Sequence, residues 1–126
     1  MSQSQTVAVI TPAFRAQDTL PTTVQSVLSQ THADWQHFII ADDGFDYAAF
    51  LDGHGLKDDR QVFMTSGGMG TGASRTRNVA LEQLQVPYVA ILDADDRLKV
   101  QKLELAVAAR CSNISGGVRS FLSTCR

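Results

Sequence analysis

The sequence predicts an α/β fold in which a mainly parallel sheet is flanked by helices. Short apolar runs, typical of strands buried on both faces, alternate with segments that carry apolar residues at helical spacing. The apolar runs are 7–10, 38–41, 61–65 and 88–92, and the helical segments begin near residues 18, 73 and 97. Strands and helices that alternate with short links favour parallel strands joined by helical crossovers.

Length and composition exclude several classes of protein. The chain has 126 residues, 44% of them apolar, which is enough for one domain with its own core. The net charge of -2 is spread along the chain without a basic block, so we expect no nucleic-acid partner. The start carries no basic region and no long apolar run, so we expect a cytoplasmic protein without a transmembrane segment.

The first strand and helix leave a loop between them. We expect the strand to end at Ile10, because Pro12 cannot donate to a strand ladder. The following helix is expected to begin at a cap formed by Asp18 or Thr19 and to end near Gln30. The loop therefore carries residues 11–14 at the carboxyl end of the first strand.

Two later strands run directly into acidic residues. The strand at 38–41 is followed by Asp42 and Asp43, and the strand at 88–92 by Asp93, Asp95 and Asp96. Carboxylates this close repel one another unless a cation or hydrogen-bond donors offset the charge, and oxygen ligands suit Mg²⁺ or Mn²⁺. The alternative is an acidic turn in which Asp95 or Asp96 caps a helix that runs to about residue 109.

A glycine-dense loop at 66–72 precedes the helix that begins near residue 73. Amide groups at a helix start can hold an anion, so this loop is a candidate phosphate site. It has neither a Walker lysine nor a dinucleotide GxGxxG after the first strand, which disfavours those assignments. Residues 51–60 are polar and turn-rich and fit either a loop or a short irregular helix.

In parallel sheets, ligands bind beyond the carboxyl ends of the strands. The segments 11–14, 42–43 and 93–96 all follow strands, so we expect them to converge on one edge of the sheet. The sequence thus predicts a ligand site that combines an aromatic loop with two acidic turns.

Several motifs together give the chain a family resemblance. They are Val-Ile-Thr-Pro-Ala-Phe at 9–14, Gln-Thr at 30–31, Ala-Asp-Asp-Gly at 41–44, Gly72 followed by Arg77-Asn78, and Leu-Asp-Ala-Asp-Asp at 92–96. In this order and spacing, over residues 5–109, the chain resembles the amino-terminal half of family 2 inverting glycosyltransferases of the GT-A fold, a Rossmann-like fold.

The resemblance implies roles for five donor-binding residues. It assigns Pro12, Phe14 and Asp42 to the nucleotide base. It places Arg77 near the ribose and diphosphate, and it makes Asp93 a ribose contact. The implied partner is a nucleoside diphosphate-sugar donor.

The resemblance also implies a divalent metal, Mn²⁺ or Mg²⁺, with Asp95 as its ligand. Such an ion stabilises the leaving nucleoside diphosphate as a Lewis acid. The implied reaction is inverting transfer of a sugar to an acceptor hydroxyl, on a glycan, a lipid or another molecule.

The sequence departs from the family pattern in the first acidic turn and at the end. Residues 42–47 read Asp-Asp-Gly-Phe-Asp-Tyr where the family usually reads Asp-Asp-Gly-Ser-Thr-Asp. The composition changes near Ala109, so we expect a donor-binding part at 1–109 and an atypical, disordered or frame-shifted tail at 110–126. We therefore expect a truncated, inactive chain whose catalytic base lies beyond the truncation, and we assign no catalytic residue.

Two other functions remain open at this point. A nucleotidyltransferase would share the sheet and acidic site but would have a glycine-rich segment with several cations after the first strand, where only Arg15 occurs. A non-catalytic, receiver-like module that binds nucleotide or metal would have an aspartate at the end of its third strand, and residues 61–65 contain none.

Overall fold

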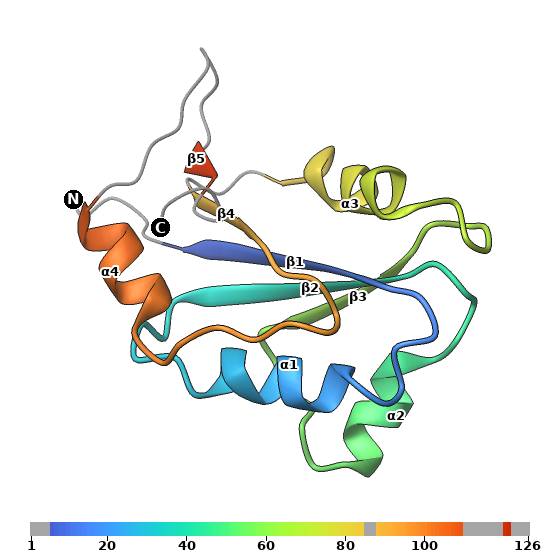
Figure 1. Cartoon of the computed structure of the whole chain (residues 1–126), viewed down its shortest axis with the longest axis horizontal. Coiled ribbons are helices and arrows are strands. Elements are labelled where there is room, and N and C mark those ends of the chain that lie inside the picture. Colours follow the sequence, from blue (N-terminus) through green and yellow to red (C-terminus); the bar gives the residue numbers. More distant parts are fainter. Residues whose placement is uncertain (1–5, 85–87, 110–119, 122–126) are drawn as a thin grey trace.

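A computed structural model describes residues 6–84, 88–109 and 120–121, and it contains a parallel sheet covered by helices (Figure 1). The elements in order are β1 (Val7–Ala13), α1 (Leu20–Leu28), β2 (Trp35–Ala41), α2 (Tyr47–Gly53), β3 (Gln61–Thr65), α3 (Ala73–Leu81), β4 (Tyr88–Ile91), α4 (Lys102–Ala109) and β5 (Ser120–Phe121). The strand order is β3-β2-β1-β4-β5, and every neighbouring pair is parallel. The predicted α/β fold with a parallel sheet is confirmed.

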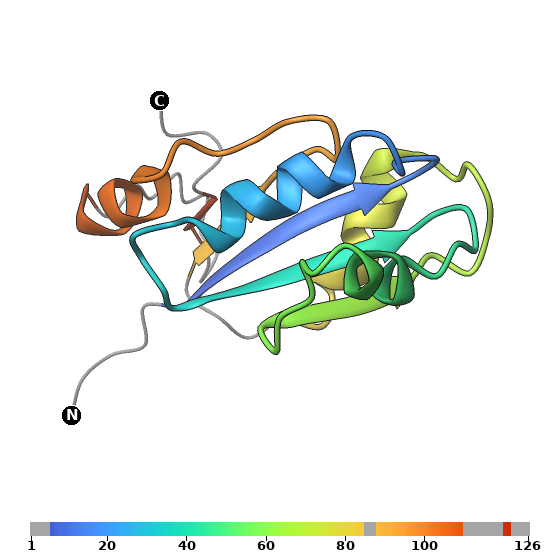
Figure 2. The ribbon, with the colours of Figure 1, turned by 90° about the horizontal axis from the view of Figure 1, so that it is seen from below.

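The helices form layers on both faces of the sheet. Residues of α1, α2 and α4 pack on one face, against alternate residues of the strands such as Val9 and Ile39. Helix α3 packs on the opposite face against Ile10 and Ile40. Seen from below, α1 lies along β1 and α2 lies near β3 (Figure 2). Burial on both faces explains why the strands read as continuous apolar runs rather than as alternating patterns.

Strand β1 is longer than predicted, because it continues through Pro12 to Ala13. The carbonyl oxygen of Ile10 accepts from the amide of Leu92 on the β4 side, and that of Ala13 accepts from Asp42 on the β2 side. Pro12 therefore faces the β4 side, beyond the last paired residue of β4, where no amide donor is required. The expectation that the strand ends at Ile10 was wrong for this reason.

The boundaries of α1 and β2 differ by a few residues from those predicted. Thr19 is the N-cap of α1, but its side chain makes no capping hydrogen bond in the structure, and the helix ends at Leu28. Strand β2 begins at Trp35, whose buried ring lies at the end of the strand away from the acidic turns. The guanidinium of Arg60 lies 3.9 Å from the centroid of that ring.

The segment 51–60 is not a separate helix. Helix α2 begins earlier, at Tyr47, and ends at Gly53, and residues 54–60 form turns that lead into β3. Asp46 is its N-cap, and the Asp46 carboxylate accepts from the amide of Ala49 at 3.1 Å.

The alternative in which Asp95 or Asp96 caps a helix is wrong, because α4 begins only at Lys102. The residues between β4 and α4 form turns, and the amide of Asp96 donates to the carbonyl oxygen of Asp93. Strand β5 pairs with β4, while the rest of the segment 110–126 lies outside the described residues. Within the described ranges, no helix is long and apolar enough to cross a membrane.

Candidate functional site

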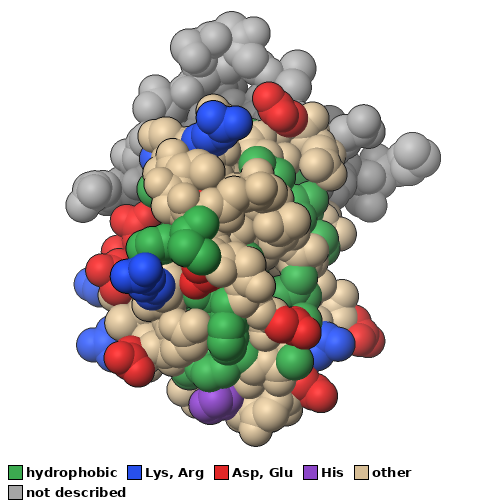
Figure 3. All heavy atoms as spheres, turned by 90° about the vertical axis from the view of Figure 1, so that its right-hand side faces the viewer, with side chains coloured by type: hydrophobic (Ala, Val, Ile, Leu, Met, Phe, Trp, Pro, Cys, Tyr) green, Lys and Arg blue, Asp and Glu red, His purple; other side chains and the backbone are tan. Residues whose placement is uncertain are grey.

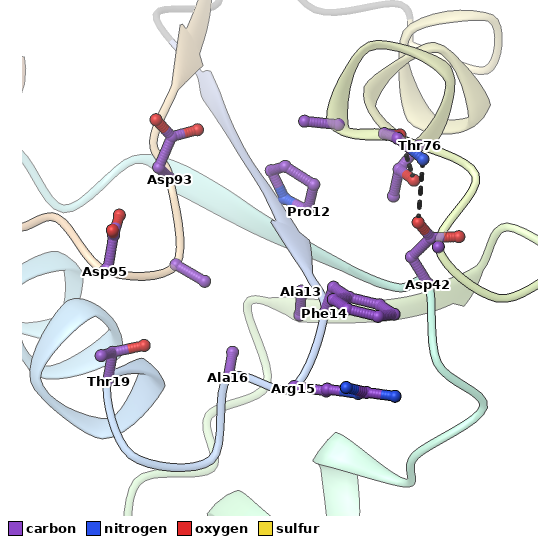
Figure 4. A pocket seen from close by; sticks show the side chains of 14 residues that line it. Pro12, Ala13, Phe14, Arg15, Ala16, Thr19, Asp42, Thr76, Asp93 and Asp95 are labelled. Atoms are coloured by element: carbon purple, nitrogen blue, oxygen red, sulfur yellow. Dashed lines mark hydrogen bonds between the residues drawn. The ribbon is translucent and has the colours of Figure 1, made fainter.

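A cavity of about 530 Å³ lies beyond the carboxyl ends of β1, β2 and β4. Its lining residues are Pro12, Ala13, Phe14, Arg15, Ala16, Thr19, Asp42, Gly70, Gly72, Ala73, Thr76, Asp93, Ala94 and Asp95 (Figure 4). Five of the six site residues selected from the sequence therefore line one cavity. It lies where the sheet order changes direction between β1 and β4, the place at which open α/β sheets bind ligands.

Arg77, the sixth predicted residue, is not part of the cavity lining. It extends from α3 so that its Nη1 lies 3.9 Å from Oδ1 of Asp93. Its Nη2 also lies 3.3 Å from the hydroxyl of Ser74. The Asp93 side chain is 61% exposed, so the ion pair is screened by solvent and the guanidinium is accessible at the rim.

Asp42 holds the glycine-dense loop in place. Its Oδ1 accepts from the hydroxyls of Ser66 at 2.6 Å and Thr71 at 2.8 Å, and its Oδ2 accepts from the amide of Gly72 at 3.2 Å. The carbonyl oxygen of Asp42 accepts from the amide of Gly70 at 2.8 Å. A carboxylate has about four acceptor positions, so the loop uses much of the capacity of this side chain.

This arrangement changes the interpretation of the loop as a phosphate site. The amide of Gly72 donates to the Asp42 carboxylate and the amide of Gly70 donates to the Asp42 backbone carbonyl, so Asp42 occupies donors that the sequence suggested for an external anion. Burial alone raises the pKa of Asp42, but hydrogen bonds from Ser66, Thr71 and neighbouring donors outweigh it and lower the pKa below its usual range. Asp42 is therefore ionised although it is only 3% exposed.

Exposed apolar side chains lie in the loops that follow the strands, and one of them, Phe14, lines the cavity. Phe14, Phe45 and Met69 are exposed large hydrophobic residues, and Figure 3 shows apolar side chains gathered on the face that carries the loops after the strands. A Cβ atom added to Gly70 would meet the ring of Phe14 at 3.6 Å, an ordinary contact, so the positive φ of 63° rather than lack of space favours glycine there. Phe14 is 43% exposed and lines the cavity.

A polar stripe formed by Thr23 and Ser26 of α1 and by Gln30 holds the acidic segment in place. These residues were not predicted from the sequence. Thr23 donates from its hydroxyl to the carbonyl oxygens of Ala94 and Asp96, on either side of Asp95. Further along the helix, Ser26 accepts from the amide of Leu98 at 3.0 Å. The available signal was the spacing of polar residues at 23 and 26 on the helix and at 30 just beyond its end.

Gln30 completes the stripe at its carboxyl end. Its side-chain amide donates to the carbonyl oxygen of Lys99 at 2.7 Å, and its oxygen accepts from the amide of Leu103 at 3.0 Å. These bonds explain why the residues between β4 and α4 follow α1 instead of forming a helix of their own.

The acidic segment supplies exposed carboxylates to the cavity. Asp93 and Asp95 both line it and both are exposed. In the part of the chain that the structure describes, no group of three or more His, Cys, Asp or Glu side chains lies close enough to hold a metal ion. The protein would thus supply one or two carboxylates, a donor set that fits Mg²⁺ or Mn²⁺ shared with substrate phosphates.

A buried histidine lies beneath the site and was not selected from the sequence. Nε2 of His37 lies 2.8 Å from the hydroxyl of Thr11, and both residues are fully buried. Burial lowers the pKa of His37 to about 3, so the ring is neutral. Among the described residues, Nδ1 of His37 is one of two buried side-chain polar atoms without a hydrogen-bond partner.

Comparison with known proteins identifies the family. The model of the family described as Glycosyl transferase family 2 matches residues 8–115. Similar proteins include TuaG of Bacillus subtilis, named for teichuronic acid biosynthesis, which is 40% identical over 98 residues, or 78% of this chain and 39% of TuaG. The chain belongs to glycosyltransferase family 2.

A second relative and a solved structure agree with this family. WfgD of Escherichia coli, a UDP-Glc:alpha-D-GlcNAc-diphosphoundecaprenol beta-1,3-glucosyltransferase, is 32% identical over 85% of this chain and 42% of WfgD. Residues 1–349 of S. aureus TarS, crystallised with UDP, share the fold with a TM-score of 0.72 at 20% identity, over 82% of this chain and 31% of that 1–349 chain. The chain thus spans about two fifths of the length of TuaG and of WfgD.

Proposed function

We propose that this chain binds a nucleoside diphosphate-sugar, most simply a UDP-sugar, as the donor-binding part of an inverting glycosyltransferase. The observation that carries the proposal is the convergence of Phe14, Asp42, Asp93 and Asp95 on one cavity with Arg77 at its rim. A volume of about 530 Å³ suits a ligand of this size. UDP in the TarS complex and UDP-Glc in the name of WfgD support the choice of base.

These residues bind different parts of the donor. The exposed ring of Phe14 stacks on the base beside Pro12, and the ionised Asp42 accepts from a base N–H. Asp93 accepts from the ribose hydroxyls, and Arg77 binds the diphosphate.

A divalent metal fits the acidic end of the cavity, where Asp95 would hold it together with diphosphate oxygens. When bound, such an ion neutralises charge on the leaving nucleoside diphosphate. The reaction would transfer the sugar to an acceptor hydroxyl, with a base outside the assigned residues. Family membership leaves no support for the nucleotidyltransferase or receiver-like alternatives.

Calorimetry on the 126-residue chain tests the donor site. UDP should bind more tightly with Mn²⁺ than without it, and Asp95→Ala should remove that difference. Asp52→Ala, which removes an exposed carboxylate from α2, is the matched control and should bind as the wild-type chain does. Binding that is equal with and without metal in all three proteins would overturn the assignment of Asp95.

A further inference from the structure

The carboxylate of Asp43, the neighbour of Asp42, joins two loops at the cavity. Its Oδ2 accepts from the amide of Arg15 at 2.7 Å and from the hydroxyl of Tyr47 at 2.8 Å. Its Oδ1 accepts from the amide of Phe45 at 3.1 Å. Asp43 therefore ties the β1–α1 loop to the β2–α2 turn.

Tyr47 adds a second connection between the same loops. Its hydroxyl oxygen accepts from the amide of Ala16 at 3.1 Å while its proton is donated to Asp43. Burial is the main cause that raises the pKa of Tyr47 to about 12; the Ala16 amide opposes it and the Asp43 carboxylate adds to it, so the hydroxyl keeps its proton. The aromatic ring packs edge-on against Phe45, with ring centroids 4.8 Å apart.

These bonds hold a backbone conformation that is unfavourable in itself. Arg15 has a φ of 49°, and in the described part of the chain it is the one residue other than glycine with a positive φ. Such a conformation costs free energy for a residue with a Cβ atom. A charge-assisted hydrogen bond from the Arg15 amide to Asp43 offsets that cost, and the bond from Ala16 fixes the next peptide.

The residue held by this arrangement is Phe14. On its amino side, the carbonyl oxygen of Ala13 accepts from the amide of Asp42 at 2.8 Å, and on its carboxyl side the Arg15 amide binds Asp43. The guanidinium of Arg15 lies 5.0 Å from the centroid of the Phe14 ring, and Figure 4 shows the ring beside Asp42. Phe14 is thus exposed at the cavity but fixed at the backbone on both sides.

We propose that Asp43 and Tyr47 are positioning residues for the nucleotide base, which act by fixing the Phe14 ring in the cavity wall. This inference rests on the proposed donor site. Tyr47 stands where the motif Asp-Asp-Gly-Ser-Thr-Asp ends in aspartate, so the hydroxyl bridge to Ala16 reflects the departure of this sequence from that motif. Fixing the ring before the base arrives reduces the ordering cost of binding.

The test compares two probes that report on different ends of the donor. UDP with Mn²⁺ contacts the whole site, whereas pyrophosphate with Mn²⁺ contacts only its diphosphate end. Tyr47→Phe removes one hydroxyl and keeps the ring, and Asp43→Asn keeps the shape of the side chain but not its charge. Tyr88→Phe, which removes a hydroxyl at the amino end of β4, is the matched control.

We expect Tyr47→Phe to weaken UDP binding by about three- to tenfold, Asp43→Asn by tenfold or more, and Tyr88→Phe not at all. Pyrophosphate affinity should change by less than about twofold in each. In a Phe14→Ala background, Tyr47→Phe should have almost no further effect on UDP, because its action passes through the Phe14 ring. If Asp43→Asn does not fold, Tyr47→Phe carries the test alone.

Equal loss of UDP and pyrophosphate affinity, or an undiminished effect of Tyr47→Phe in the Phe14→Ala background, would overturn the inference. If the wild-type chain binds UDP and both variants bind it equally tightly, the inference is also overturned, but the proposed function stands. Failure of the wild-type chain to bind UDP would overturn both.

Discussion

The hydroxyl of Thr23 in α1 lies 2.9 Å from the carbonyl oxygen of Ala94 and donates a hydrogen bond to it. The same hydroxyl donates to the carbonyl oxygen of Asp96, so Thr23 contacts the backbone on both sides of Asp95. A helix from the first third of the chain thus determines where the proposed metal ligand lies. Thr23 is 1% exposed, so its hydroxyl is shielded from bulk water and bonds within the protein.

Thr23→Val should therefore affect both stability and the metal-dependent part of donor binding. The loss of a buried hydrogen-bond donor is expected to lower the free energy of unfolding by about 1–3 kcal/mol, measured by urea denaturation. UDP affinity with Mn²⁺ should fall towards the metal-free value, whereas affinity without metal should stay the same. Thr23→Ser keeps the hydroxyl and should retain most of the metal effect, so similar losses in both variants would contradict the role of the hydroxyl.

Arg77 and Arg75 on α3 form a matched pair for a second prediction. Arg77 lies beside Asp93 at the cavity rim, and Arg75 is an exposed residue of the same helix. Arg77→Ala should weaken UDP binding about tenfold or more through the lost diphosphate contact. Its thermal stability should change little, because an exposed ion pair contributes about 0–1 kcal/mol.

Arg75→Ala should leave UDP affinity within about twofold of the wild-type value. Comparable losses from both arginine substitutions would mean that the effect is a general reduction of positive charge rather than a specific contact of Arg77.

Two glycines should respond to alanine in opposite directions. Gly72 has a φ of 107°, so Gly72→Ala should lower the free energy of unfolding by about 1–3 kcal/mol, although space is available for its Cβ. Gly53 ends α2 with an ordinary φ and open space around it, so Gly53→Ala should raise that free energy by about 0.4–1 kcal/mol. Urea denaturation of both variants gives the comparison, and two changes of the same sign would contradict it.

The sequence predicted the sheet and the cavity because both depend on local patterns. Apolar runs buried on both faces identify the strands, and parallel strands necessarily bring Phe14, Asp42 and Asp93 to one edge. The contacts that shape the site could not be predicted in this way. The bonds from Thr23 to Ala94 and from Arg15 to Asp43 join residues distant in the chain and depend on the packing of α1 and α2.

Pro12 is a single residue whose place in the structure could not be predicted from the sequence alone. Its ring is compatible with a strand only where the neighbouring strand has already ended, and that depends on the register of β1 with β4. The rule that proline ends a strand does not take that register into account, because the register cannot be read from the sequence alone. The first strand was therefore predicted to end too early, because its true end depends on tertiary structure.

His37 leads to a prediction about pH. Its pKa is about 3 in the folded protein, against an ordinary value of 6.5, because the buried ring cannot be hydrated when charged. Above pH 6.5 the ring is neutral in both states. Below that pH only the unfolded chain takes up the proton, so stability falls as the pH decreases towards 3. The loss due to His37 should reach about 2 kcal/mol at pH 5.

Urea denaturation at pH 7.5 and pH 5 measures this difference in stability. Asp42 and Asp43 titrate only in more acidic solution, because their pKa values are lowered. His37→Gln keeps a side chain that can hydrogen-bond to Thr11 but does not titrate, so its stability should differ between the two pH values by about 2 kcal/mol less than that of the wild type. His32 and His54 remain in both proteins and cancel in the comparison. An equal pH dependence in the two proteins would show that His37 is protonated in the folded state, because only a ring that resists protonation makes the folded and unfolded chains differ in bound protons.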